Sequence, residues 1–179
     1  MSVANFITLG RLLAAPLAIW LVLDDRMTAA FWLFVAAGLS DAVDGFIAKH
    51  FDQRSRLGAL LDPLADKVLL LSMFVTLGID GWLPNWLVIL VVFRDALIIG
   101  GFLLASSVAQ PIPTKPLYVS KLNTALQIML VAVVLARLGL GLDDFGASLV
   151  LIYATALTTV LSGGGYLVRW MRGPAGEGA

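Results

Sequence analysis

The chain contains no cysteine, so it can form no disulfide bond and can hold no metal ion through thiolates. Charged residues are also scarce: they make up 13% of the sequence, about half the share of an ordinary soluble domain. Hydrophobic residues account for 60% of the chain, and the mean hydropathy is +0.94. This composition excludes an ordinary soluble domain and predicts an integral membrane protein.

Apolar runs long enough to cross a bilayer, which takes about 20 helical residues, recur along most of the chain. Polar or helix-breaking segments separate them, for example Asp24-Asp25-Arg26 and the proline-rich PIPTKP at 111–116. We therefore predict an all-α, polytopic membrane protein with six transmembrane helices: Phe6–Leu23, Thr28–Lys49, Gly58–Ile79, Trp82–Ser106, Leu117–Leu138 and Phe145–Met171. The first is expected to be a spanning helix and not a cleaved signal, because no small-residue cleavage site precedes a soluble part.

The basic residues are distributed unevenly between the two sides of the expected membrane. One side carries Arg26 and Arg137, and the other carries Arg11, Lys49, Arg54, Arg56, Lys115, Lys121, Arg169 and Arg172. The bias of Lys and Arg toward the inner side places both termini in the cytoplasm, with the bacterial inner membrane as the expected location. We expect one membrane domain over residues 1–172 and a short disordered tail over 173–179.

Four aspartates stand close together in this apolar chain. Asp41 and Asp44 are three residues apart near the end of the second expected helix, and Asp62 and Asp66 are four apart near the start of the third. Both spacings put a pair on one helical face, and the short loop between the helices makes them expected antiparallel neighbours. Four carboxylates converging in a low-dielectric region persist only if protons, basic partners or cations neutralise them.

Divalent cations are the natural partners of such a cluster. Carboxylates suit Mg²⁺ or Mn²⁺, and these ions take their remaining ligands from water and substrate phosphates, so a diphosphate is the leading substrate. Gly45 and Gly58 lie on the same stretch and would let a ligand touch the backbone. The alternative is that the aspartates are solvated helix ends beside a basic loop. That is the stronger interpretation for any single aspartate, but four at paired spacings favour a functional site.

Written as a pattern, the segment from Asp41 to Asp66 is D-x2-D-G-x2-A-K-x8-G-x3-D-x3-D. It resembles the signature of the CDP-alcohol phosphotransferase family, departing from it at Lys49, where that family usually has arginine. Lysine keeps the charge but not the planar fork that binds a phosphate bidentately. The resemblance covers essentially the whole chain: NFITLGR at 5–11 is similar to the family's N-terminal element. FRD at 93–95 and VSKLNT at 119–124 resemble the CMP-forming cardiolipin synthases.

The resemblance implies a two-metal transfer of a phosphatidyl group from CDP-diacylglycerol to phosphatidylglycerol, with release of CMP. It implies two Mg²⁺ or Mn²⁺ ions bound by Asp41, Asp44, Asp62 and Asp66, with Asp66 also acting as general base. The residues implied to bind CDP-diacylglycerol are Asn5, Thr8, Asp44, Gly45, Lys49 and Gly58. Those expected to approach the acceptor are Arg94, Lys115, Lys121 and Asn123. The family further implies a homodimer, and no nucleic-acid partner is expected.

Several alternatives stay open at this point. Arg94 can equally be a structural partner of Asp95, and ordinary positive-inside anchoring explains Lys121 almost as well as acceptor binding. The nearest rival function is phosphatidylglycerophosphate synthase, whose acceptor is glycerol 3-phosphate. An intramembrane prenyltransferase also uses aspartate-rich helices on a diphosphate, and a cation transporter could bind its ion through these aspartates, although no convincing internal repeat is found.

Overall fold

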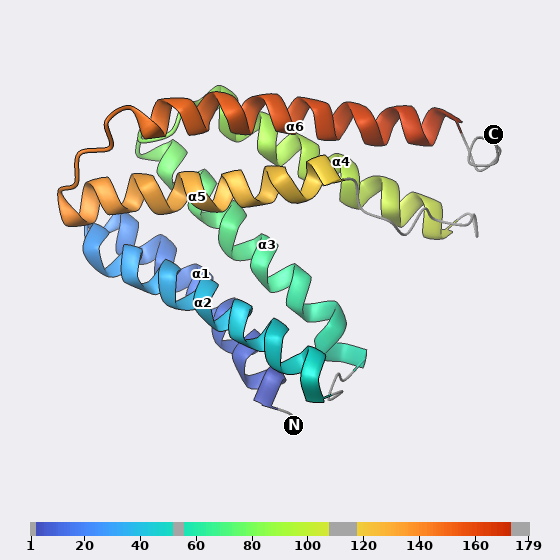
Figure 1. Cartoon of the computed structure of the whole chain (residues 1–179), viewed down its shortest axis with the longest axis horizontal. Helices are drawn as coiled ribbons and strands as arrows, with labels where there is room; N and C mark the ends of the chain where they lie inside the picture. Colours follow the sequence, from blue (N-terminus) through green and yellow to red (C-terminus); the bar gives the residue numbers. More distant parts are fainter. Residues whose placement is uncertain (1–2, 52–55, 108–117, 173–179) are drawn as a thin grey trace. The chain divides into compact units, whose positions relative to one another are not determined.

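A computed structural model describes the backbone of residues 3–51, 56–107 and 118–172, and the side chains of residues 10–40, 67–101 and 118–170 (Figure 1). Within that part the chain is entirely α-helical. The helices are α1 (Val3–Leu23), α2 (Met27–Phe51), α3 (Arg56–Ile79), α4 (Asn85–Ser107), α5 (Tyr118–Leu140) and α6 (Ala147–Arg172). The predicted all-α class is confirmed, and most helix ends agree with the sequence within a few residues. The expected tail over 173–179 lies outside the described residues.

The start of α4 differs from the prediction because the turn before it has its own local structure. Gly81 has a positive φ of 78°, which glycine adopts without steric cost. The amide of Trp82 reaches back to the carbonyl of Leu77 at 2.9 Å, which closes the end of α3 in the manner of a Schellman cap. Pro84 comes next, and α4 begins only at Asn85. Trp82 therefore belongs to the cap of α3, although its hydrophobicity suggested the start of α4.

The described helices form two packing units, one of which contains α1, α2, α3 and the end of α5. In this unit α1 packs against both α2 and α3. The buried face of α1 is rich in small side chains, including Ala14, Ala15 and Ala18, whereas α3 buries the large side chains of Met73 and Phe74. Small residues let helix backbones approach closely, which is how apolar helices gain packing contacts in a lipid setting.

The end of α5 lies against the start of α2 in the same unit. A Cβ atom built on Gly139 would stand 2.7 Å from the carbonyl carbon and oxygen of Met27 and from the amide nitrogen of Thr28. The Thr28 hydroxyl donates a hydrogen bond of 2.5 Å to the carbonyl oxygen of Gly139. This contact therefore depends on the absence of a side chain at position 139.

The second unit contains α4, the start of α5 and α6, and within it α4 packs against α6. Gly101 of α4 makes room for the indole of Trp170, because a Cβ at that glycine would stand 1.7 Å from a ring carbon. The interior of this unit is unusually polar. Its buried polar and charged side chains are Arg94, Asp95, Asn123, Gln127, Ser148, Thr155, Thr158, Thr159 and Ser162.

Two helical segments in the described part are long and apolar enough to cross a membrane: Tyr118–Leu140 and Ala147–Trp170. Shorter apolar stretches are Gly10–Leu23, Met27–Ser40 and Lys67–Ile79. The number of spans and the side on which the termini lie are not decided by these lengths, so the six-span topology stays a prediction.

Candidate functional site

The four signature aspartates lie on two consecutive helices. Asp41 and Asp44 belong to α2, and Asp62 and Asp66 belong to α3, so the helical backbone that the pairing argument requires is present. Residues three or four apart on a helix share one face. Only residues 52–55 separate the two helices. Because so short a segment spans only a short distance, the end of α2 and the start of α3 must be close to each other.

The side chains of these aspartates lie outside the described residues. So do the side chains of Asn5, Thr8 and Lys49, the surroundings of Gly45 and Gly58, and the whole of Lys115. Four carboxylates form a donor set of oxygen atoms that fits Mg²⁺ or Mn²⁺. Among the residues whose side chains are described, no group of three His, Cys, Asp or Glu could hold a metal ion. The metal-binding role of the signature stays a prediction.

Arg94 is buried inside the second unit, with 4% of its surface exposed. Its Nη1 donates a hydrogen bond of 2.5 Å to Oδ1 of Asp95. Its Nε and Nη2 donate to the hydroxyl of Ser162 on α6, at 3.2 and 2.6 Å, and Nη2 also donates to the hydroxyl of Ser120 on α5. Each nitrogen of the guanidinium therefore has a partner, and together these partners tie α4 to both α5 and α6.

This geometry shows the structural interpretation that the sequence left open for Arg94, and the acceptor role of Arg94 stays a prediction. The arginine is paired with Asp95, as the structural interpretation required. It also contacts Ser120, which lies next to Lys121, another residue expected to approach the acceptor. Sequence reasoning missed Ser120 and Ser162. The sequence contains only a weak signal for these two partners, because no characteristic spacing relates a serine in one apolar helix to an arginine in another.

Asn123 lies in a second buried polar cluster between α5 and α6. It is 0% exposed, and its Oδ1 accepts hydrogen bonds of 2.9 Å from the hydroxyls of Thr158 and Thr159. Nearby on the same two helices, the amide nitrogen of Gln127 and the hydroxyl of Thr155 are buried and have no hydrogen-bond partner in the described part of the chain. An acceptor-binding role for Asn123 stays a prediction, and the structure shows its contact with α6.

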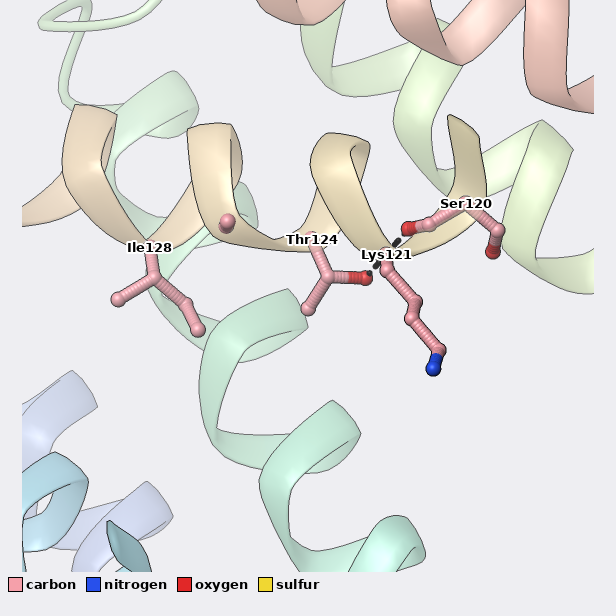
Figure 2. A pocket seen from close by; sticks show the side chains of 5 residues that line it. Ser120, Lys121, Thr124 and Ile128 are labelled. Atoms are coloured by element: carbon pink, nitrogen blue, oxygen red, sulfur yellow. Dashed lines mark hydrogen bonds between the residues drawn. The ribbon is translucent and has the colours of Figure 1, made fainter. Parts of the chain in front are cut away.

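Lys121 lies at an open hollow of about 390 Å³ on one side of α5 (Figure 2). The hollow is lined by Ser120, Lys121, Thr124, Ala125 and Ile128. The Thr124 hydroxyl donates a hydrogen bond of 3.2 Å to the carbonyl oxygen of Ser120. The hollow thus combines one ammonium group, two hydroxyl-bearing residues and an apolar end.

Comparison with known proteins identifies the family. The sequence model described as CDP-alcohol phosphatidyltransferase matches residues 1–161. The chain belongs to this family. Its membership confirms the resemblance carried by the aspartate signature, which lies wholly inside the matched range.

Individual relatives are similar over most of this chain. It is 36% identical to a cardiolipin synthase (CMP-forming) / mitochondrial hydrolase fusion protein of Schizosaccharomyces pombe, over 93% of this chain and 31% of that protein. It is 33% identical to the human cardiolipin synthase (CMP-forming), over 92% of this chain and 60% of the human protein. It is also 32% identical to a chloroplastic CDP-diacylglycerol–glycerol-3-phosphate 3-phosphatidyltransferase of Oryza sativa, over 95% of this chain and 57% of the rice protein. The chain therefore spans 31–60% of the length of these relatives.

Proposed function

We propose that this chain is a CMP-forming cardiolipin synthase, which transfers the phosphatidyl group of CDP-diacylglycerol to phosphatidylglycerol. The observation that carries the proposal is the family match over residues 1–161, together with relatives of that name at 33–36% identity. The signature aspartates on α2 and α3 supply the carboxylates that such a reaction needs.

In the proposed reaction, a hydroxyl oxygen of phosphatidylglycerol attacks the phosphorus atom that carries the diacylglycerol. The bond between this phosphorus and the oxygen of the CMP leaving group breaks, and CMP departs with the electron pair. Asp66 accepts the proton of the attacking hydroxyl, a role that requires it to come within about 3 Å of that oxygen.

Asp41, Asp44, Asp62 and Asp66 are the residues proposed to hold two divalent ions. When bound, such ions neutralise the charge of a diphosphate and stabilise the attacking and leaving oxygens. Asn5, Thr8, Asp44, Gly45, Lys49 and Gly58 are proposed to border the CDP-diacylglycerol. Arg94, Lys115, Lys121 and Asn123 are proposed on the acceptor side.

The proposed setting is a membrane, crossed by six helices with both termini in the cytoplasm. Exposed large hydrophobic side chains on several helices support it, since many such side chains can face lipid. Examples are Leu13 of α1, Ile89 and Phe93 of α4, and Val150 of α6. The proposed site lies on the cytoplasmic side of a bacterial inner membrane, because the basic residues of the sequence concentrate there.

A second candidate function is phosphatidylglycerophosphate synthase, in which glycerol 3-phosphate replaces the lipid acceptor. The rice relative carries that name and matches almost the whole chain, which is the observation in its favour. An intramembrane prenyltransferase or a cation transporter has no comparable support, since the chain belongs to the CDP-alcohol phosphatidyltransferase family.

The test is an assay of the purified full chain in lipid vesicles, with CDP-diacylglycerol, Mg²⁺ or Mn²⁺ and each acceptor separately. The proposal expects metal-dependent CMP release with phosphatidylglycerol and a product lacking any phosphomonoester. A product that keeps a terminal phosphomonoester, formed only with glycerol 3-phosphate, would establish the second candidate. Chemical cross-linking of the same vesicles tests the proposed homodimer.

A further inference from the structure

Ser120 belongs to two polar features of the second unit at once. Its hydroxyl accepts a hydrogen bond from Nη2 of Arg94, and the residue also lines the hollow on α5 beside Lys121. Arg94 is buried, Ser120 is half-buried and Lys121 is exposed. Ser120 is thus the residue that links the buried guanidinium to the open hollow.

The contact with Arg94 determines the role of the Ser120 oxygen. A guanidinium has only donors, so the oxygen of Ser120 must be the acceptor in this bond. The proton of the same hydroxyl stays available to another acceptor, because the described part of the chain shows no hydrogen bond that the Ser120 side chain donates. Hydrogen bonds in a chain polarise one another, so a hydroxyl that accepts from a cation becomes a stronger donor. The hollow therefore has a hydroxyl donor next to an ammonium group.

The charges of the described residues indicate what kind of anion suits the hollow. Arg94 is paired with Asp95 at 2.5 Å, so these two groups together add little net charge. Lys121 then supplies one positive charge at the hollow, and its ammonium lies 6.0 Å from the centre of the Tyr118 ring. A phosphodiester carries a single negative charge, whereas a phosphomonoester carries about 1.5 to 2 at pH 7. A single positive charge matches the phosphodiester better.

We infer that the hollow on α5 binds the phosphodiester of a lipid acceptor through Lys121 and Ser120, with Arg94 acting as a positioning residue behind Ser120. The inference rests on the proposed function and goes further, because it assigns Ser120 a donor role and selects a lipid phosphodiester over a phosphomonoester. Ala125 and Ile128, at the apolar end of the hollow, suit the start of a lipid chain.

Steady-state kinetics of Ser120→Ala test this assignment. A hydrogen bond to a charged group is worth about 1.5 kcal/mol or more, which corresponds to roughly a tenfold change in affinity. The KM for phosphatidylglycerol should rise about tenfold, while the KM for CDP-diacylglycerol and kcat stay within about twofold. Ser120→Thr, which keeps the hydroxyl, should restore the KM.

Ser162→Ala is the matched control for these kinetics. Ser162 also accepts from Arg94 but does not line the hollow, so its loss removes support for the arginine and leaves the donor in place. Its KM for phosphatidylglycerol should change much less than that of Ser120→Ala. Equal effects of the two variants, or an unchanged KM in Ser120→Ala, would overturn the inference.

A binding measurement separates this inference from the proposed function and does not need the alanine variant to fold. Because the chain has no cysteine, Ser120→Cys introduces a single thiol whose rate of alkylation reports occupancy of the hollow. Short-chain phosphatidylglycerol, without CDP-diacylglycerol, should slow alkylation at least fivefold. The exposed Leu122→Cys, outside the hollow, should react unchanged.

The remaining outcomes of this measurement are equally distinct. Protection by glycerol 3-phosphate or inorganic phosphate at the same concentration would mean that a free phosphate occupies the hollow, which contradicts the lipid assignment. Absence of protection by any of them would overturn the inference even if the enzyme makes cardiolipin. Conversely, protection without any cardiolipin synthesis would refute the proposed function and keep the site.

Discussion

Arg94 shows how a charged side chain is accommodated within an apolar helix. Burying a guanidinium is costly unless its donors are satisfied, and here Asp95, Ser120 and Ser162 satisfy them. The planar fork allows one side chain to reach partners on three helices at once. The same residue thus contributes to packing and, through Ser120, to the proposed acceptor site.

Arg94→Leu is expected to lower the thermal unfolding midpoint in detergent, because it breaks the buried ion pair between Arg94 and Asp95. Breaking a buried ion pair from one side costs about 3–5 kcal/mol. Arg94→Leu combined with Asp95→Leu should recover part of that loss, since no carboxylate is then left without the arginine. A double variant less stable than Arg94→Leu would contradict this account of the pair.

Asp66→Asn is expected to reduce CMP release by a factor of about 10² to 10⁴, because the amide cannot accept the proton of the acceptor hydroxyl. Asp80→Asn is the control, since Asp80 is an exposed carboxylate in the turn after α3. The two variants should have the same size-exclusion profile as the wild type. An Asp66→Asn protein that retains full activity would remove the proposed general base.

At the scale of helices, the contact between α5 and α2 depends on Gly139. Gly139→Ala would place a methyl group 2.7 Å from backbone atoms of Met27 and Thr28, so the two helices must separate. Overpacking of this kind costs about 1–3 kcal/mol, and the unfolding midpoint should fall. Gly164→Ala in α6 is the control, because nothing lies within 4 Å of its Cβ position and alanine favours a helix. Equal midpoints for the two variants would show that this contact is unimportant.

Helices were the easiest elements to predict from the sequence, because apolar runs interrupted by polar turns fix their positions to within a few residues. The start of α4 was less accurate, since Trp82 is as hydrophobic as the helix that follows but serves to cap α3. The aspartate pairs on α2 and α3 could be assigned to helices from spacing alone. The hydrogen-bond partners of Arg94 could not be predicted from the sequence, because packing between helices brings Ser120 and Ser162 to the arginine.

The polar interior of the second unit illustrates the same limit. Hydropathy marks Tyr118–Leu140 and Ala147–Trp170 as apolar, yet these helices bury Asn123, Thr158 and Thr159 against each other. Side-chain hydrogen bonds between helices in lipid are worth about 0.6 kcal/mol each on average. Their contribution is to specify which faces of α5 and α6 meet, and average hydropathy contains no information about that choice.

At the scale of the whole molecule, the proposed orientation in the membrane rests on the distribution of charge and can be tested directly. The sequence has no cysteine, so a single introduced thiol reports its own location. Gln53→Cys, between α2 and α3, should react with a membrane-impermeant maleimide only after bacterial cells are permeabilised. Asp143→Cys, exposed between α5 and α6, should react in intact cells. The expectation follows from the excess of Lys and Arg near the α2–α3 connection. Three helices, α3, α4 and α5, lie between these two connections, and an odd number of spans puts the connections on opposite sides of the membrane. Labelling of both positions in intact cells would contradict this topology. The reverse pattern would place the aspartates on the outer side, away from a cytoplasmic supply of CDP-diacylglycerol.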